Sequence, residues 1–394
     1  MAAPLPLEEV LARVQTAAPE RRAALERTVA ARGSLLQAGR LPNPLFEVRA
    51  ENWRLTSEGI STTDPSLDLF ATVSQPIELG GKRARRQAVA AADAAAADAE
   101  LRQTERQLTL DTARLYLAAV RARELGHYLS ENRHELEPLL DSMQRRVARG
   151  YAAEADLMKL RAEAARVDAQ RAQARLDLDR AVVTLGAALA EAGPVDAARL
   201  VEPALVPPVA GSPPELAARI VDTLPEVVAS RARIERGRQT LRLERAQRLP
   251  DPLLTAGYKR TAEADTLVTG VVVPIPVFNT NAGNIQRAAA EERSAALEHQ
   301  ALVRRLTAEL VSLVASARDL TARARRIEEE LLEPAHVART AARATFRETG
   351  TNVLQLVDAE RVHADAHRDA LDLKLEAYAR SFEIELDLAE VSPR

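Results

Sequence analysis

The chain has no cysteine among its 394 residues. This excludes disulfide bridges, thiolate metal centres, cysteine nucleophiles and a lipid-modified N-terminal cysteine in this sequence. Phe, Trp and Tyr together make up only 3% of the residues, and glycine contributes only 15. An enzyme with an aromatic core fits this composition poorly. The abundance of Ala, Leu, Arg and Glu instead favours long packed helices.

An excess of charge of one sign is also absent, because 54 basic residues oppose 57 acidic ones and the net charge is −3. No basic field is present, so we expect no nucleic-acid partner. No apolar run approaches the roughly 18 residues of a membrane-spanning helix. The first residues lack the basic and apolar regions of a signal peptide, and we expect a mature or trimmed form of the protein.

One unusual local pattern occurs twice in the sequence. LPNP at Leu41–Pro44 precedes a polar–apolar alternating stretch, then VSQPIELGGKR at Val73–Arg83, then a long helical run. LPDP at Leu249–Pro252 precedes a second alternating stretch, then VVVPIPVFNTNAG at Val271–Gly283, then another long helical run. The duplication predicts an internal two-fold repeat, in which a proline-bounded β-hairpin interrupts the helices of each half.

The first long run predicts a coiled-coil helix. Its apolar residues keep a strict seven-residue spacing, the pattern of a helix–helix seam. These residues are Leu101, Leu108, Leu115, Ala122, Leu129, Leu136 and Met143. We expect Pro138 to kink this helix without ending it.

These patterns predict two structural repeats joined by a proline-rich connector. The first repeat (1–190) comprises an N-terminal helix, a β-hairpin (43–79), a long helix (81–149), a tip turn (150–154) and a helix (155–190). The connector covers residues 191–214 and is expected to be non-helical. The second repeat (215–394) comprises a helix (225–248), a β-hairpin (251–278), a long helix (284–348), a tip turn (349–352) and a helix (353–390). At 1.5 Å per residue the helix lengths match when both hairpins lie at one end and both turns at the other.

The two hairpins predict four strands of about 10 residues, the length of a transmembrane β-strand. Four strands cannot close a membrane barrel, so several chains would have to share one. Trp53 and Tyr258 fall in these strands and fit either an interfacial aromatic belt or packing within the hairpin. The residues expected at the strand–helix transitions are Pro42, Pro44, Pro76, Gly80, Gly81, Pro250, Pro252, Pro274 and Pro276. Gly80-Gly81-Lys82 also suggests a phosphate loop, but the leading glycine and the following Ser or Thr are absent.

The LPNP, SQPIELGGKR and PIPVFNTNAGN segments resemble the outer-membrane efflux protein family typified by TolC, and most closely its CzcC-like branch. That branch serves heavy-metal efflux pumps of the RND type. The resemblance covers about residues 7–390. It implies a mainly α-helical chain with a small β part, and a homotrimer whose long helices form a coiled-coil helical barrel. It further implies four strands per chain in a shared twelve-stranded transmembrane barrel, a periplasmic adaptor and an inner-membrane pump as partners, and location in the Gram-negative outer membrane with a periplasmic extension.

The same resemblance assigns residues to the tip of the channel. It implies that the tip turns, which would contact the adaptor, contain Gly150, Tyr151, Gly350 and Thr351. It also implies an acidic ring at the tunnel entrance, for which Asp156 and Asp358 are the matching positions. A second acidic position of the TolC entrance falls on Gln355, a departure from the family pattern. Both aspartates also fit a simpler role in the first turns of helices, where acids interact well with the helix dipole.

His363 and His367 lie four residues apart on a predicted helix, a spacing that can hold a metal ion with Glu360 as the third ligand. The alternative is a solvated polar face. No catalytic constellation and no cofactor site emerge, so we expect a protein that is not an enzyme. The leading hypothesis is a passive exit duct, gated at its tip, that exports divalent heavy-metal cations. The alternatives are a duct for drug efflux or type I protein secretion and, in another class, a soluble coiled-coil scaffold or periplasmic adaptor.

Overall fold

The computed structural model describes residues 3–52, 54–56, 59–61, 67–207, 209–261, 264–349 and 351–391. The chain forms two compact units. One comprises residues 1–23, 102–224 and 303–394, and the other comprises residues 24–101 and 225–302. Each unit therefore combines segments that are far apart in the sequence.

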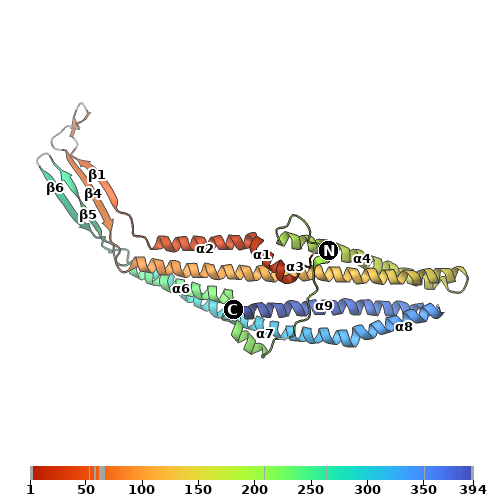
Figure 1. Cartoon of the computed structure of the whole chain (residues 1–394). Helices are drawn as coiled ribbons and strands as arrows, with labels where there is room; N and C mark the ends of the chain where they lie inside the picture. Colours follow the sequence, from red (N-terminus) through yellow and green to blue (C-terminus); the bar gives the residue numbers. More distant parts are fainter. Residues whose placement is uncertain are drawn as a thin grey trace. The chain divides into compact units, whose positions relative to one another are not determined.

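Helices account for most of the described residues (Figure 1). They are α1 (Leu7–Ala17), α2 (Pro19–Ala38), α3 (Lys82–Ala148), α4 (Glu154–Ala188), α5 (Pro213–Ile220), α6 (Pro225–Ala246), α7 (Ala282–Ile327), α8 (Glu333–Thr349) and α9 (Val353–Val391). A 3₁₀ turn, η1, covers Ala197–Arg199, and a π-helical turn, η2, covers Glu328–Leu332. Within the part of the chain that the structure describes, no helix is both long and apolar enough to cross a membrane.

The unit made of residues 24–101 and 225–302 contains a four-stranded antiparallel sheet. Its strands are β1 (Leu45–Glu51), β4 (Asp68–Pro76), β5 (Leu253–Arg260) and β6 (Asp265–Val272), in the order β1-β4-β5-β6. Strands β2 (Arg54–Thr56) and β3 (Gly59–Ser61) form a separate two-stranded ladder. The four-stranded sheet thus joins the two predicted hairpins through β4 and β5.

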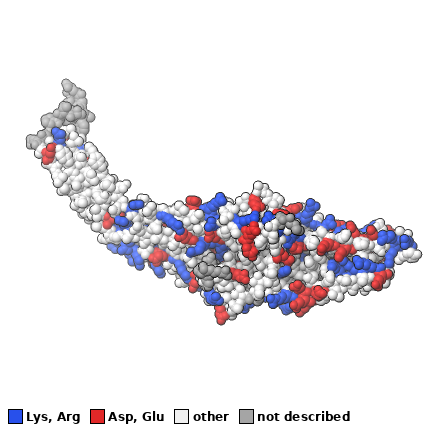
Figure 2. All heavy atoms as spheres, in the orientation of Figure 1, with Lys and Arg blue, Asp and Glu red and all other residues white. Residues whose placement is uncertain are grey.

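The backbones of β4 and β5 approach closely at Gly257. A Cβ atom there would lie 2.4 Å from the carbonyl oxygen of Ala71 and 2.7 Å from Cα of Thr72. Many apolar side chains of the sheet are exposed, and Figure 2 shows few charged atoms on its visible face, whereas both signs of charge are interspersed over the helices. The exposed apolar residues are Leu45, Phe46, Val48, Leu69, Val73, Leu254, Leu267, Val271 and Val272.

The other unit is built on the predicted seven-residue series, which is confirmed as the packing stripe of α3. Its members from Ala122 onward are buried, and Leu108 and Leu115 are half-buried against the core. Helix α3 continues through Pro138, as predicted. Tyr116, on the same helix, is fully buried and its hydroxyl group accepts a hydrogen bond from the Val201 amide at 2.8 Å. The hydroxyl also lies 3.0 Å from the carbonyl oxygen of Leu5, to which it donates.

Three predicted boundaries need correction. The connector 191–214 is not free of helix, because Asp196 accepts a hydrogen bond from the Ala198 amide and starts η1, and α5 begins at Pro213. Strand β6 ends at Val272, since the prolines that follow have no N–H group to donate to a sheet. The helix predicted at 284–348 is not one continuous α-helix, because η2 interrupts it.

Candidate functional site

The strand–helix transition residues surround one hydrogen-bonded junction. Gly80 and Gly81 both have positive φ, at 69° and 68°, which lets the chain turn from β4 into α3. The first residue of α3, Lys82, is buried, and its Nζ donates to the Leu249 carbonyl oxygen at 2.6 Å and pairs with Asp251 at 2.8 Å. The lysine of the glycine pair is therefore engaged within the protein, which argues against a phosphate loop.

The prolines of the two signatures lie on both sides of this junction. Pro42 and Pro44 lie between α2 and β1, and Pro250 and Pro252 lie between α6 and β5. Pro76 is the last residue of β4. Pro42 and Pro252 offer carbonyl oxygens, which accept from Gln75 Nε2 at 3.0 Å and from the Ile77 amide at 2.9 Å. Proline carbonyls thus complete hydrogen bonds where the ladder ends. Pro274 and Pro276 follow β6 outside any strand.

The turn at Gly150 ends α3 in the left-handed conformation, with φ of 76°. The Gly150 amide donates to the Val147 carbonyl oxygen and the Tyr151 amide donates to the Arg146 carbonyl oxygen, both at 2.9 Å. This pair of bonds is the Schellman motif, which satisfies the last carbonyls of a helix. Tyr151 is left exposed at the turn.

The second turn joins α8 to α9. Gly350, predicted as its turn former, lies outside the described residues. Thr351 is exposed, and its hydroxyl lies 2.9 Å from that of Thr349. Nη1 of Arg146, near the end of α3, donates to the Thr349 carbonyl oxygen at 2.6 Å. The ends of α3 and α8 are therefore in direct contact.

The two predicted entrance acids occupy different surroundings. Asp156 lies in the first turn of α4 and its carboxylate accepts a hydrogen bond from Lys159 at 3.1 Å. Asp358 lies in the second turn of α9, is exposed, and makes no ion pair with the described residues. Asp156 thus has a local partner on its own helix, whereas the charge of Asp358 faces solvent in this chain. Gln355, the departure from the family pattern, is also exposed.

A buried charged cluster that the sequence did not predict joins α3, α8 and α9. Both Arg343 and Glu360 are buried, and the guanidinium group makes two hydrogen bonds with the carboxylate, one of them 2.8 Å between Nη2 and Oε2. The same guanidinium also donates to Glu135, and to Oδ1 of Asn132 at 3.2 Å. Burial alone would lower the pKa of Arg343, but its bonds to the two carboxylates outweigh this and raise it.

The histidines lie beside this cluster and not on a solvated face, so that alternative is wrong for His363. Only 4% of His363 is exposed, and its Nδ1 shares a hydrogen bond of 2.8 Å with the Tyr128 hydroxyl group. The ring of His367 stacks on that of Tyr128 with centroids 4.0 Å apart. Burial, together with the charge of Arg339, lowers the pKa of His363 to about 3, so its ring is neutral near pH 7.

The metal site suggested from the sequence is not formed. Glu360 is fully buried and both of its carboxylate oxygens are bonded to Arg343, so the third ligand is already engaged. Among the described residues, no three His, Asp or Glu side chains are grouped closely enough to hold a metal ion. The spacing of two histidines on one helix did not reveal that the glutamate faces an arginine.

Helices of this length, coupled to a four-stranded antiparallel sheet, have the fold of outer-membrane channels. The structure aligns with that of CusC with a TM-score of 0.80 and 15% identity, over 97% of this chain and 91% of that one. It aligns with VceC from Vibrio cholerae with a TM-score of 0.78 and 20% identity, over 98% of this chain and 95% of that one. These likenesses establish the fold.

Sequence comparisons confirm the resemblance proposed above. Residues 10–191 match the family model described as outer membrane efflux protein. The chain is similar to the cobalt-zinc-cadmium resistance protein CzcC of Cupriavidus metallidurans, with 28% identity over 362 residues that cover 91% of this chain and 84% of that protein.

Proposed function

We propose that this chain is the outer-membrane exit duct of a tripartite, RND-type efflux system, and that three copies form one channel. The observation that carries the proposal is the four-stranded sheet. Strands β1 and β6 each pair on one side only within the sheet order β1-β4-β5-β6. A membrane barrel needs at least eight strands and no open edge. Three copies contribute twelve strands, and pairing β6 of one copy with β1 of the next closes the barrel.

The surface of the sheet supports a membrane location for this part. Exposed residues such as Phe46, Leu267 and Val271 present apolar side chains that water solvates poorly. A lipid-facing band of a β-barrel requires such side chains. The helices, with interspersed charges of both signs, suit an aqueous periplasmic location (Figure 2).

Cysteine cross-linking tests this assembly directly, because the native chain contains no cysteine. One cysteine replaces Val48 on β1 and a second is placed in turn at Thr266, Val268 and Gly270 on β6. We expect oxidation to yield a covalent trimer for at least one pair. A monomer-only or dimer-only result for every pair would contradict the shared barrel. The single variants, which cannot form a closed ring of links, serve as controls.

The exported substrate is proposed from the relative. CzcC is a cobalt-zinc-cadmium resistance protein, and we infer that this chain also exports divalent heavy-metal cations, passively and without a catalytic step. Deleting its gene should lower tolerance to zinc, cobalt, cadmium or copper, and an adaptor and inner-membrane pump should co-purify with the protein. Unchanged metal tolerance together with lower drug tolerance, or with loss of a secreted protein, would favour the corresponding alternative duct.

A duct needs the hairpins for membrane insertion, whereas a soluble scaffold or adaptor does not. Removing residues 43–79 should leave a scaffold soluble and folded, whereas it should abolish membrane insertion of a duct. The full-length duct should require detergent and should conduct ions in a planar bilayer. A detergent-free, monodisperse protein without conductance would overturn the proposal.

We further assign the turns containing Gly150, Tyr151, Gly350 and Thr351 to contact with the adaptor, and Asp358 to an acidic ring at the entrance. Exposure of Asp358 and the absence of an ion pair with the described residues support this role. Three copies of one acid around an aqueous entrance attract cations. The Lys159 partner of Asp156 makes that residue a weaker member of such a ring.

Conductance at low salt tests the ring. We expect Asp358→Asn to lower the cation preference of the channel, because one negative charge per subunit is lost. Asp365→Asn is the matched control, since Asp365 is an exposed acid one heptad further along α9 and already pairs with Arg368. Equal effects of the two substitutions would contradict the assignment of Asp358.

A further inference from the structure

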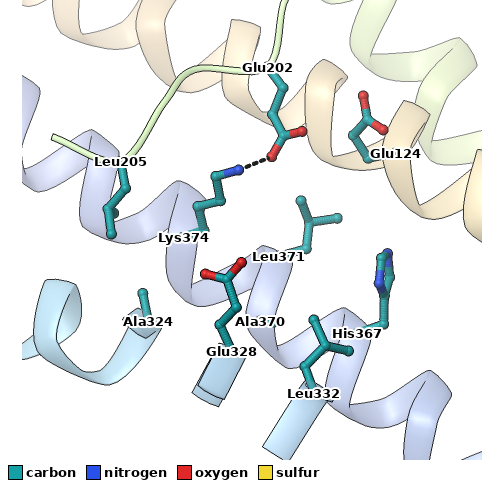
Figure 3. A pocket seen from close by; sticks show the side chains of 10 residues that line it. All are labelled: Glu124, Glu202, Leu205, Ala324, Glu328, Leu332, His367, Ala370, Leu371 and Lys374. Atoms are coloured by element: carbon teal, nitrogen blue, oxygen red, sulfur yellow. Dashed lines mark hydrogen bonds and ion pairs between the residues drawn. The ribbon is translucent and has the colours of Figure 1, made fainter. Parts of the chain in front are cut away.

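A cavity of about 180 Å³ lies within the unit made of residues 1–23, 102–224 and 303–394 (Figure 3). Helices α3, α7 and α9, the turn η2 and the connector before α5 all contribute to its walls. The lining combines apolar side chains with four charged ones and one histidine. An apolar wall with a few convergent polar groups is the usual form of a site for a small molecule.

Hydrogen-bond acceptors predominate among the polar groups of the cavity. Glu202 accepts a bond from Lys374 Nζ at 2.6 Å, and Glu124 accepts one from Arg123 Nε at 3.0 Å. Each of these carboxylates uses only Oε1, so its Oε2 is not hydrogen-bonded to the described residues. The carboxylate of Glu328, an exposed residue of η2, makes no ion pair with the described residues. Three carboxylates therefore face a single ammonium group, which favours a cationic ligand.

His367 adds a neutral acceptor to the same cavity. Its ring stacks on that of Tyr128, with centroids 4.0 Å apart. Burial and the charge of Arg339 lower the pKa of His367, so the ring is neutral near pH 7. Neither ring nitrogen is hydrogen-bonded to the described residues. A neutral imidazole has one nitrogen that accepts a hydrogen bond, and here that nitrogen is available to a ligand.

The acceptors are divided between two ends of the cavity. In Figure 3, Leu371 lies between Glu328 on one side and His367 on the other. Glu202 lies on the side of Glu328, and Glu124 lies on the side of His367. A hydrocarbon surface thus separates two groups of acceptors. An aliphatic diamine has the complementary arrangement, because its two ammonium groups only donate and a methylene chain joins them.

Other classes of ligand fit this lining less well. Over the described part of the chain, no three His, Asp or Glu side chains are grouped closely enough to hold a metal ion, which favours an organic cation. An anion would meet three carboxylates. A wholly apolar ligand would take these acceptors out of water without giving them hydrogen-bond donors.

We propose that the cavity binds a short aliphatic diamine, with one ammonium group at Glu328 and the other between Glu124 and His367. The inference needs only one folded chain and does not rest on the proposed function. A channel without this site, or the site in a protein that conducts no ions, would therefore separate the two proposals.

Calorimetric titration of the full chain in detergent tests the site, with putrescine, a four-carbon diamine, as the probe. We expect saturable binding of one diamine per chain. Glu328→Gln should weaken the affinity by about tenfold or more, because a charge-assisted hydrogen bond is lost. Glu329→Gln is the matched control, since Glu329 is also an exposed acid of η2 but does not line the cavity, and it should change the affinity by less than about twofold. Absence of saturable binding to the unaltered protein, or equal losses in the two variants, would overturn the proposal.

Two further probes and one variant test the class of ligand. Butylamine has one ammonium group and should bind more weakly than putrescine, so equal affinities would contradict a site with two ends. Zinc chloride should not displace the diamine, and displacement would show a metal site instead. Ala370→Leu fills the cavity without changing its charge and should abolish binding, even if Glu328→Gln fails to fold. Binding that persists in Ala370→Leu would place the diamine elsewhere and overturn the proposal.

Discussion

Arg343 and Glu360 face each other in the interior, with Nη2 of the arginine 2.8 Å from Oε2 of the glutamate. Both side chains are buried, so removing Glu360 leaves the Arg343 guanidinium with only the partly exposed Glu135 as a carboxylate partner, and removing Arg343 leaves the buried Glu360 carboxylate without its arginine. The net attraction between the two groups is therefore small compared with the free energy that is lost when one of them is removed. The pair fixes α8 against α9 for this reason.

This relationship predicts a non-additive mutant cycle. Glu360→Leu should lower the free energy of unfolding by about 3–5 kcal/mol, and the double variant with Arg343→Met should recover part of that loss. Urea unfolding measures both. Arg323→Met, which removes an exposed pair with Asp319, is the control and should cost under about 1 kcal/mol. A double variant less stable than the single one would contradict this account.

The close approach of β4 and β5 predicts that alanine is tolerated less well at Gly257 than at Gly270. Gly257→Ala should disrupt the sheet, because the added Cβ would lie 2.4 Å from the carbonyl oxygen of Ala71. Gly270→Ala on β6 is the matched control, since nothing lies within 4 Å of its Cβ position. Heat resistance of the assembled protein in detergent gels should fall for the first variant only. Equal resistance of both would mean that the strands separate readily at Gly257.

Stability should depend on pH through His363. Its pKa is about 3 when folded, below the usual value near 6.5, so the unfolded chain binds the proton more readily. Stability is therefore complete above about pH 6.5 and decreases as the pH falls toward 3, by up to about 1.4 kcal/mol per pH unit. His363→Gln should flatten this dependence in urea titrations at several pH values.

His134→Gln is the control for that measurement, because the side chain of His134 is 87% exposed. Besides burial, the neighbouring Arg339, His336, His367 and Arg343 side chains all lower the pKa of His363. An unchanged pH slope in His363→Gln would place the acid sensitivity elsewhere, for example in Glu163. Burial would raise the pKa of Glu163, but Arg166 and Arg361 outweigh this and lower it, so its contribution is lost only below about pH 4.3.

Removing the hydroxyl oxygen of Tyr116 should lower the free energy of unfolding. Tyr116→Phe leaves the Val201 amide and the Leu5 carbonyl group without their shared partner, and should cost about 1–3 kcal/mol of unfolding free energy. Tyr151→Phe, at an exposed position, should change it by less than about 0.5 kcal/mol. A negligible loss for Tyr116→Phe would show that water replaces the hydroxyl group.

The helices and strands could be predicted from the sequence where the spacing of apolar residues determines them. The stripe from Leu108 to Met143 needs only the periodicity of one helix. The buried pair of Arg343 and Glu360 could not be predicted in this way, because charged residues on a helix are normally solvated and their partners here come from other helices. For His363 the decisive neighbour, Tyr128, lies on α3, far away in the sequence.

The π-helical turn η2 could not be predicted from the apolar pattern. Beyond η2, buried Ala335 keeps the seven-residue spacing of Val314 and Thr321, while Arg339 and Arg343 occupy other inward positions of α8. A prediction that considers only apolar residues does not detect buried arginines. The short helix α5 was missed for a related reason, since its prolines at the first two positions suggested a connector.

The pairing of β4 with β5 also constrains the time course of folding. Val73 of β4 lies opposite Ala256 of β5, so the four-stranded sheet cannot form until the ribosome has synthesised β5 and β6. Helices need only local contacts and form first, whereas the strands must bring distant segments together at an entropic cost. We therefore expect the sheet to form later than the individual helices that precede it in the chain.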